Sequence, residues 1–310
     1  MNTDVCIAID STCNLPRSYI DNNAIRILPI GLKMDGEIIP DLLDPTKSVE
    51  LYQSGKLEKN FDAETIPYSS AEMSRLLEDE LVLNYDKVLA ITIMQTRSET
   101  YKNIRDAVFI SQPKFKDLRS QHGKERSFRI SVFDSNTIFT GHGLLTYEAV
   151  RMLKEESATP EQIIFSLENL KNRVRAFLIP RELFYIKKRG ASKGDNSINW
   201  LSYQMGNMLN VKPIIQAYQG DTGPVDKAMG FTSGVEKILN TAREAIDKGL
   251  LIKAIVMSYA GDLAEIEAMD SYQKFVSYAN SKGIETLFSV MSITAAINVG
   301  PGSFSLAYAE

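Results

Sequence analysis

The stretch VLAITIMQTRSETYKNIRDA, residues 88–107, decides the fold of this chain. Its first part, 88–93, is a continuous apolar run of strand length, a pattern typical of a strand that is covered on both faces. A polar turn follows, and apolar residues then recur at helical spacing until Pro113, where we expect the helix to end. The order of strand, polar turn and helix predicts one unit of a parallel α/β sheet.

The polar turn of this unit carries hydroxyl groups that can contact an anion. Ser98 stands at the expected start of the helix, where a hydroxyl can accept a hydrogen bond from a backbone N–H. Ligands of open α/β sheets bind beyond the carboxyl ends of the strands, and the first turn of a helix favours negative charge. Ser98 and Thr100 are therefore candidate contacts for an anionic head group. An ordinary helix cap without a ligand is the alternative, which this segment alone favours.

Composition limits the class of protein. The chain has 310 residues, 44% hydrophobic and 24% charged, as in ordinary globular proteins of one or two domains. Its net charge of −4 gives no electrostatic reason to expect nucleic acid as a partner. We expect a cytoplasmic protein, because the first residues lack a basic signal-peptide region and no apolar run reaches the ~18 residues of a membrane span. Cys6 and Cys13 suit neither a metal site nor a disulfide framework, and we expect no metal or cofactor.

Apolar runs and turn residues predict the remaining elements. We expect strands at 5–9, 25–32, 128–133, 176–179, 211–218, 251–259, 285–290 and 303–308. We expect helices at 17–22, 46–54, 69–83, 140–152, 182–188, 200–209, 234–248 and 263–282, and one more that starts after Thr159. We expect connections at 65–69, 111–127, 219–224 and 297–302, with a flexible stretch at 190–196.

The order of these elements predicts two α/β domains. Strand, polar turn and helix repeat about four times in residues 1–157, which indicates a mainly parallel sheet. The pattern changes near residue 175, and we expect residues 158–310 to form a second α/β domain with a mixed sheet. The C-terminal segment can pack back across the interface between the two domains.

Short motifs along the chain resemble the DegV family of two-domain lipid-binding proteins. Residues 9–12 with 14–16, IDST and NLP, are similar to that family's opening D-S-T-x-D-L-P, and SETY at 98–101 stands at the place of its S-G-T-Y. Further matches in the family's order are 27–32 with 35–36, 65–69, 134–135 with Gly141 and Gly143, 187–190, 211–214 and 300–302. Each match is short, but together they cover nearly the whole chain.

The resemblance implies a tunnel between the two domains that holds one long-chain fatty acid. In better-known members the protein is the fatty-acid-carrying subunit of a two-component fatty acid kinase, and it has no catalytic residues of its own. A separate ATP-dependent subunit phosphorylates the bound carboxyl group. The implied partners are this kinase subunit, an acyltransferase and, transiently, a membrane. A solvated loop is the favoured interpretation of the basic stretch 114–129, although it could touch a bilayer.

The resemblance also implies which residues lie near the fatty acid head group. Ser98 and Thr65 match the family's head-group hydroxyls, with Thr100 beside them and Asn298 at the position of a family histidine. The residues expected close by are Asp10, Ser11, Glu99, Met229 and Gly300.

This sequence departs from the family pattern around that site. Glu99 replaces the glycine of S-G-T-Y, and Met229 falls where an arginine is usual. With Asn298 in place of histidine, we expect a cation and a proton-exchanging group to be missing near the head group. We expect Glu99 to point into solvent at the helix N-terminus, where a carboxylate is favoured.

Two other functions remain open. A hydrolase or transferase for a small polar substrate could use Asp10, Ser11, Asp134 and His142, which supply carboxylates, a nucleophile and a base near strand ends. No G-x-S-x-G, P-loop or G-x-G-x-x-G motif supports this. The other possibility is a protein that has kept the fold and lost lipid binding. A long apolar tunnel favours lipid, whereas a short polar cleft favours the enzyme.

Overall fold

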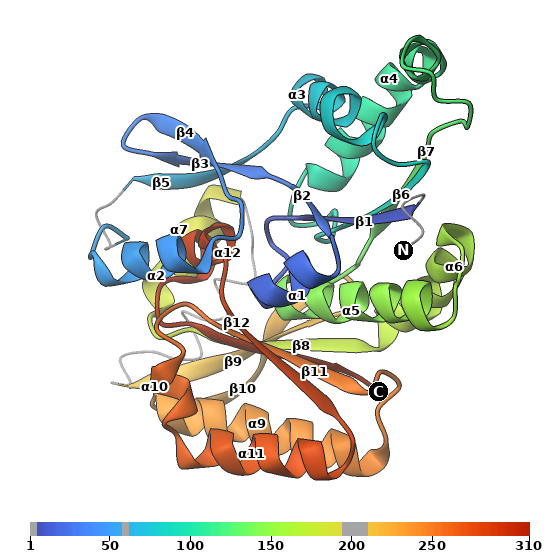
Figure 1. Cartoon of the computed structure of the whole chain (residues 1–310). Coiled ribbons are helices and arrows are strands. Elements are labelled where there is room, and N and C mark those ends of the chain that lie inside the picture. Colours follow the sequence, from blue (N-terminus) through green and yellow to red (C-terminus); the bar gives the residue numbers. More distant parts are fainter. Residues whose placement is uncertain (1–4, 58–61, 194–209) are drawn as a thin grey trace.

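The computed structural model describes residues 5–57, 62–193 and 210–310 of the chain. Figure 1 shows two stacked α/β layers: sheet A at the top, sheet C at the bottom, and helices between them. A small sheet B lies at one side. The fold class is the predicted one, with a parallel sheet in the first half of the chain and a mixed sheet in the second.

Sheet A is entirely parallel and buried on both faces. Its strands are β2 (Arg26–Leu28), β1 (Val5–Asp10), β6 (Lys87–Thr92) and β7 (Arg129–Asp134), in that order across the sheet. Alternate residues of β6 enter different hydrophobic clusters, Leu89 and Ile91 on one face, Val88 and Ala90 on the other. This double burial explains why β6 reads as an unbroken apolar run.

Helices cover both faces of sheet A. The helices of the first half are α1 (Arg17–Asn22), α2 (Pro45–Gln53), α3 (Ser70–Leu76) with a π-helical turn (Leu77–Leu81), α4 (Thr100–Gln121) and α5 (Phe139–Glu155). Helices α3 and α4 pack on each other above the sheet, and α1 and α5 lie below it (Figure 1). The predicted helix 17–22 is confirmed with the same bounds.

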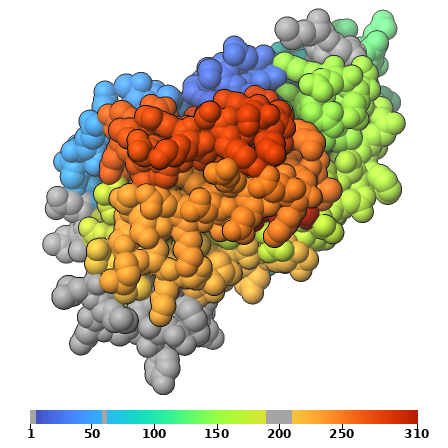
Figure 2. Space-filling view, turned by 90° about the horizontal axis from the view of Figure 1, so that it is seen from below, coloured from blue at the N-terminus to red at the C-terminus, as the bar shows by residue number. Residues whose placement is uncertain are grey.

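Sheet C is mixed, and only β11 and β12 run parallel. Its strands, in order across the sheet, are β10 (Asp221–Met229), β9 (Val211–Tyr218), β8 (Val174–Ile179), β13 (Phe304–Ala309), β11 (Ala254–Tyr259) and β12 (Glu285–Val290). Helices α9 (Phe231–Lys248) and α11 (Asp270–Ser281) cover its outer face side by side, as Figure 2 shows from below.

Helix α5 joins the two layers. It packs on β1 and β6 of sheet A and on β8, β11 and β13 of sheet C. Two glycines permit this contact: a Cβ at Gly143 would stand 2.7 Å from the Asn14 carbonyl oxygen in the segment after β1, and one at Gly141 would stand 3.1 Å from the Ala176 Cβ on β8. One hydrophobic cluster around α5 includes Ile7 and Ala309. The division at residue 157 remains a prediction.

The remaining elements lie at the sides of these layers. They are sheet B, formed by β4 (Glu37–Pro40), β3 (Ile30–Met34) and β5 (Ala63–Pro67), and the helices α6 (Pro160–Leu170), α7 (Leu183–Lys193), α10 (Ala264–Glu267) and α12 (Ile293–Val299), with a 3-10 turn at Lys171–Arg173. Thr159 caps α6 in a capping box, as its sequence predicts. Among the described residues, no helix has both the length and the apolar character needed to cross a membrane.

Two predictions around sheet B are wrong. The apolar run 25–32 is not one strand, because it divides at Pro29 into β2, which pairs with β1, and β3, which belongs to sheet B. The stretch 65–69 is not only a loop, because Thr65 and Ile66 belong to β5 and pair with β3. Short strands that pair across the fold leave no local pattern that separates them from a loop.

The prediction that the helix after β6 ends at Pro113 is also wrong. Helix α4 runs through Pro113 to Gln121, so only residues 122–127 of the predicted stretch 111–127 form an exposed connection. Phe115 and Arg119 are buried on its inner face, and Arg119 donates to the carbonyls of Val82 and Tyr85, at 2.6 and 2.7 Å, and pairs with Asp86. These contacts outweigh the missing N–H of one exposed proline.

Several boundaries in the second half differ from the prediction. The expected helix 263–282 is two helices, α10 and α11. The expected turn 297–302 begins inside α12, and that at 219–224 already belongs in part to β10. The predicted flexible stretch 190–196 is wrong at 190–193, which belong to α7. Its residues 194–196 and the helix predicted at 200–209 lie outside the described residues.

Candidate functional site

A cavity of about 750 Å³ lies where sheets A, B and C meet α7 and α12. This volume is in the range of small-molecule sites. The apolar part of its lining comes from sheets B and C, from α5, α7 and α12, and from the loops after β6 and β7: Ile30, Ile66, Pro67, Ile93, Ile138, Phe139, Leu178, Ile186, Ile215, Pro224 and Val299. The polar part is Thr12, Thr65, Gln95, Thr96, Arg97, Ser98, Glu99, Thr222, Thr294 and Asn298.

The loop between β6 and α4 supplies most of the polar lining. Ser98 is half-buried, its Oγ lies 2.8 Å from Thr100 Oγ1, and it accepts from the Thr100 backbone N–H at 3.3 Å. Glu99, not Ser98, is the N-cap residue of α4, and its side chain makes no capping hydrogen bond. Thr100 is buried behind Ser98 and is outside the cavity lining. Ser98 therefore presents a positioned hydroxyl at the start of a helix.

Sheet B and α12 bring two more of the predicted residues to the same cavity. Thr65 comes from β5, and Asn298 comes from α12, where its Nδ2 donates to the Thr294 carbonyl at 2.8 Å. The carboxylate of buried Asp41 anchors the start of α12, because it accepts from Thr294 N–H at 2.8 Å and from Thr294 Oγ1 at 2.7 Å. Burial raises the pKa of Asp41, although these hydrogen bonds oppose the shift.

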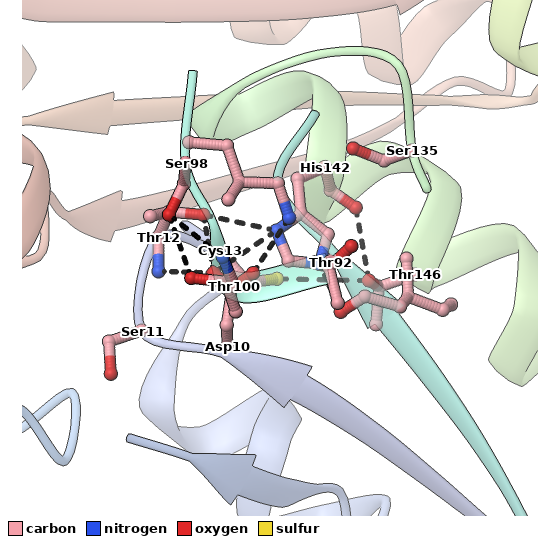
Figure 3. Close-up of polar contacts among 12 residues, drawn as sticks. Asp10, Ser11, Thr12, Cys13, Thr92, Ser98, Thr100, Ser135, His142 and Thr146 are labelled. Atoms are coloured by element: carbon pink, nitrogen blue, oxygen red, sulfur yellow. Dashed lines mark hydrogen bonds and ion pairs between the residues drawn. The ribbon is translucent and has the colours of Figure 1, made fainter. Parts of the chain in front are cut away.

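A buried polar cluster lies behind the cavity at the end of β1 (Figure 3). Thr12 Oγ1 donates to Asp10 Oδ1 at 2.6 Å and lies 3.3 Å from His142 Nδ1. Asp10 also accepts from the N–H groups of Thr12, at 2.9 Å, and Ile93, at 2.7 Å. His142 Nε2 lies 3.0 Å from the Ile91 carbonyl oxygen and therefore carries the hydrogen. Burial lowers the pKa of His142, and the charges of Asp10 and Asp134 oppose this.

The neighbouring Ser11 does not join this cluster. Its Oγ donates to the Asp41 carbonyl at 2.7 Å and accepts from the Ile30 N–H at 2.8 Å, so it ties β1 to sheet B. Asp134 Oδ1 accepts from two backbone N–H groups, those of Gln95 at 3.2 Å and Asn136 at 3.0 Å. The four residues of the enzyme alternative thus do not form a nucleophile–base pair, because the hydroxyl nearest His142 belongs to Thr12.

The absence of a cation near the head group stays a prediction, but a cation that the sequence analysis did not expect lies next to Ser98. Arg97 lines the same cavity, and its guanidinium donates to the Thr222 hydroxyl on β10. Thr96 Oγ1 donates to the Gly220 carbonyl at 3.1 Å, which is a second link between this loop and the β9–β10 hairpin. Glu99 is exposed and also borders the cavity. A positive and a negative side chain therefore flank Ser98.

Four of the five predicted nearby residues lie outside the cavity lining, and only Glu99 belongs to it. Met229 is the last residue of β10 and is 65% exposed. Gly300 ends α12 with φ at +92°, and a Cβ there would stand 2.3 Å from the Tyr185 ring. Asp10 and Ser11 are fully buried and reach the cavity only through their neighbours.

Sequence reasoning missed Thr12, Arg97 and Thr294 as cavity residues. Thr12 had a usable signal, because it follows β1 at the same sheet edge as the loop after the adjacent parallel strand β6. Thr294 had none, because α12 was not predicted. In the part of the chain that the structure describes, no group of three or more His, Cys, Asp or Glu side chains could hold a metal ion.

Comparisons with known proteins agree with this architecture. A family model described as "Uncharacterised protein, DegV family" matches residues 4–310. A DegV domain-containing protein of Xanthomonas axonopodis pv. citri is 32% identical over 303 residues, which are 98% of this chain and 96% of that protein.

Solved structures with similar folds include proteins that bind or carry fatty acids. A stearic-acid-binding protein from Eubacterium ventriosum has a TM-score of 0.76 at 21% identity and covers 100% of this chain and 98% of its own. The fatty acid kinase B3 protein of Streptococcus pneumoniae, loaded with linoleic acid, has a TM-score of 0.71 at 14% identity and covers 99% of both chains. At these identities the similarity concerns the fold.

Proposed function

The chain belongs to the DegV family, and on this premise we propose that it binds one long-chain fatty acid in the cavity between its sheets. The acyl chain lies along the apolar lining, and the carboxylate lies among the hydroxyls of Ser98 and Thr65, near Asn298. The observation that carries the proposal is the cavity itself, which combines eleven apolar side chains with hydroxyl groups contributed by separate elements.

The apolar lining accounts for the affinity. Burial of an acyl chain contributes about 0.8 kcal/mol per methylene, so about fifteen methylenes give roughly 12 kcal/mol before the costs of association and ordering. The head group then only has to avoid a penalty for burial. A small polar substrate could not use this surface, and the proposal therefore favours a lipid over the hydrolase or transferase alternative.

The polar lining suits a carboxylate. Hydroxyls of Ser98 and Thr65 can donate to an anion, and the hydrogen bond between Ser98 and Thr100 fixes the position of the Ser98 oxygen. Arg97 adds positive charge next to Ser98. The exposed Glu99 also borders the cavity, and its negative charge opposes binding of a carboxylate. A comparison of charged and neutral head groups is therefore the sharpest test of this site.

We extend the proposal to presentation of the fatty acid to a separate kinase subunit, without catalysis by this chain. The fold similarity to the fatty acid kinase B3 protein supports this. In such a reaction a carboxylate oxygen of the fatty acid attacks the γ-phosphorus of ATP, which leaves acyl phosphate and ADP. An acyltransferase or a membrane would then receive the acyl group.

The test is equilibrium binding of radiolabelled palmitate to delipidated protein, with octanoate, laurate and stearate as competitors. We expect saturable binding of one palmitate, with affinity that rises about fourfold per added methylene until the cavity is filled. No saturable binding of any of these acids would favour a protein that has kept the fold and lost its ligand. Tight binding of a small polar metabolite in their place would favour the enzyme.

A further inference from the structure

The cluster behind the cavity contains a titratable group that simple lipid binding does not use. His142 is fully buried, yet only one side chain separates it from the cavity. That side chain is Thr12, which lines the cavity and contacts both Asp10 and His142 through the same oxygen (Figure 3). Thr12 therefore links the proposed head-group site to an imidazole.

The hydrogen bonds of this cluster are incomplete when His142 is neutral. Its Nε2–H donates to the Ile91 carbonyl, so Nδ1 carries no hydrogen and can only accept. The one hydroxyl hydrogen of Thr12 already points to Asp10, because the 2.6 Å separation of the two oxygens requires a hydrogen between them. Nδ1 thus faces an oxygen that has no hydrogen to give.

One added proton on His142 would complete the hydrogen bonds of this cluster. A proton on Nδ1 would donate to Thr12 Oγ1, which would continue to donate to Asp10, while Nε2–H would keep its bond to Ile91. Each donor of the imidazolium and of Thr12 would then have an acceptor. Asp10, with His142 Nδ1 3.9 Å from its Oδ1, would face the new positive charge.

We propose that His142 takes up one proton when an anionic head group binds in the cavity, and that Thr12 connects the two sites. This inference rests on the proposed function and deepens it, because it makes His142 a positioning residue that favours ligands with a negative head group. The proton comes from the buffer, and the ligand stays a carboxylate. His142 thus takes the role of proton-exchanging group that the sequence does not provide at Asn298.

The charges around His142 have opposing effects. Asp10 on β1 and Asp134 after β7 favour the protonated imidazole, and burial disfavours it, so the pKa of the unliganded residue lies below its ordinary value. Arg97 in the loop after β6 is the positively charged side chain of the described cavity lining. A bound carboxylate adds a negative charge on the Thr12 side and shifts the balance toward proton uptake.

The experiment is calorimetric titration of delipidated protein with palmitate at pH 7, in buffers that differ in ionisation enthalpy. The dependence of the observed enthalpy on the buffer gives the number of protons taken up. The matched control variant is His122→Gln, because His122 is the only other histidine in the chain and is exposed. The control ligand is hexadecanol, which has the same tail and a neutral head group.

We expect proton uptake approaching one per palmitate in the wild type and in His122→Gln, and uptake near zero in His142→Gln and with hexadecanol. Equal uptake in His142→Gln would overturn the inference, because the proton would then reside elsewhere. If His142→Gln fails to fold, the NMR resonances of the two imidazole nitrogens in the wild-type protein report the protonation state of His142 instead. We expect those of His142 to become imidazolium-like with palmitate and to stay neutral with hexadecanol, and neutral shifts in both cases overturn the inference.

These outcomes separate the inference from the proposed function. Saturable palmitate binding without proton uptake at His142 leaves the lipid site intact and removes the proton-coupling role. Absence of saturable palmitate binding in the wild type contradicts the proposed function, and the inference fails with it.

Discussion

The two sides of the cavity are built by different kinds of sheet. The polar side follows the carboxyl ends of parallel strands β1 and β6, where Thr12 and Ser98 stand in neighbouring loops. The apolar side includes antiparallel strands β8 and β9, whose side chains alternate: Leu178 and Ile215 face the cavity, while Ile214 packs in the core with α9. The loops after two parallel strands thus supply Thr12 and Ser98, whereas antiparallel β8 and β9 supply apolar side chains and antiparallel β5 adds the hydroxyl of Thr65.

The largest expected effect comes from breaking the apolar side. Ile215→Asn places an amide against the acyl chain, and we expect palmitate affinity to fall more than about a hundredfold, because apolar contact is lost and an amide is desolvated. Ile214→Ala is the matched control on the opposite face of the same strand. It should lower the free energy of unfolding by about 2–4 kcal/mol and leave palmitate affinity within about twofold. Equal losses of affinity in both variants would show that β9 acts through stability alone.

Substitutions on the polar side of the cavity should weaken palmitate binding less, and the loss of affinity should depend on the head group of the ligand. Ser98→Ala and Thr65→Ala each remove one donor to a carboxylate, and we expect about tenfold weaker palmitate binding in each, from a loss of about 1.5 kcal/mol. Hexadecanol binding should change much less. A variant that weakens the acid and the alcohol alike would place its hydroxyl away from the head group.

Removing the cation should have a smaller effect that salt modulates. We expect Arg97→Gln to weaken palmitate binding about threefold to fivefold, as for a partly exposed charge, and to leave hexadecanol binding unchanged. The difference between wild type and variant should shrink as salt concentration rises. Because Arg97 also donates to Thr222, the variant Thr222→Val is the control for loss of that link. An identical salt-independent loss in both variants would contradict a role for the charge.

The smallest expected effect is on the pH dependence of the free energy of unfolding of the unliganded protein. Burial lowers the pKa of folded His142, so the unfolded chain binds more protons as pH falls below about 6.5. Stability is therefore full above that pH and declines below it, by no more than about 1.4 kcal/mol per pH unit from this residue. Thermal unfolding at several pH values should show a shallower acid decline in His142→Gln than in His122→Gln. Parallel declines would mean that His142 does not contribute.

Elements that leave a local pattern were predictable from the sequence, whereas elements that depend on contacts across the fold were not. Strand β6 and the start of α4 were predicted because a strand buried on both faces and a polar helix start each leave a local pattern. Strand β5 and the division of 25–32 into β2 and β3 were not predicted, because pairing across the fold decides them. The helix was wrongly predicted to end at Pro113, because contacts of Arg119 with residues distant in sequence stabilise its continuation.

The candidate site shows the same limit. Thr65, Ser98 and Asn298 were singled out from motifs, and the fold brings them to one cavity. Their role at the head group stays a prediction. The contact between Thr12 and His142 could not be predicted, because it joins the end of β1 to a helix far along the chain, whose close approach Gly143 permits.

The most direct measurement is native mass spectrometry, with organic extraction, of the protein as purified from a bacterial host without added lipid. We predict one bound fatty acid of fourteen to eighteen carbons in the wild type and in Ile214→Ala, and none in Ile215→Asn. An empty wild-type protein that also fails to take up added palmitate would contradict the account. So would a bound lipid that Ile215→Asn retains, since the ligand would then lie outside this cavity.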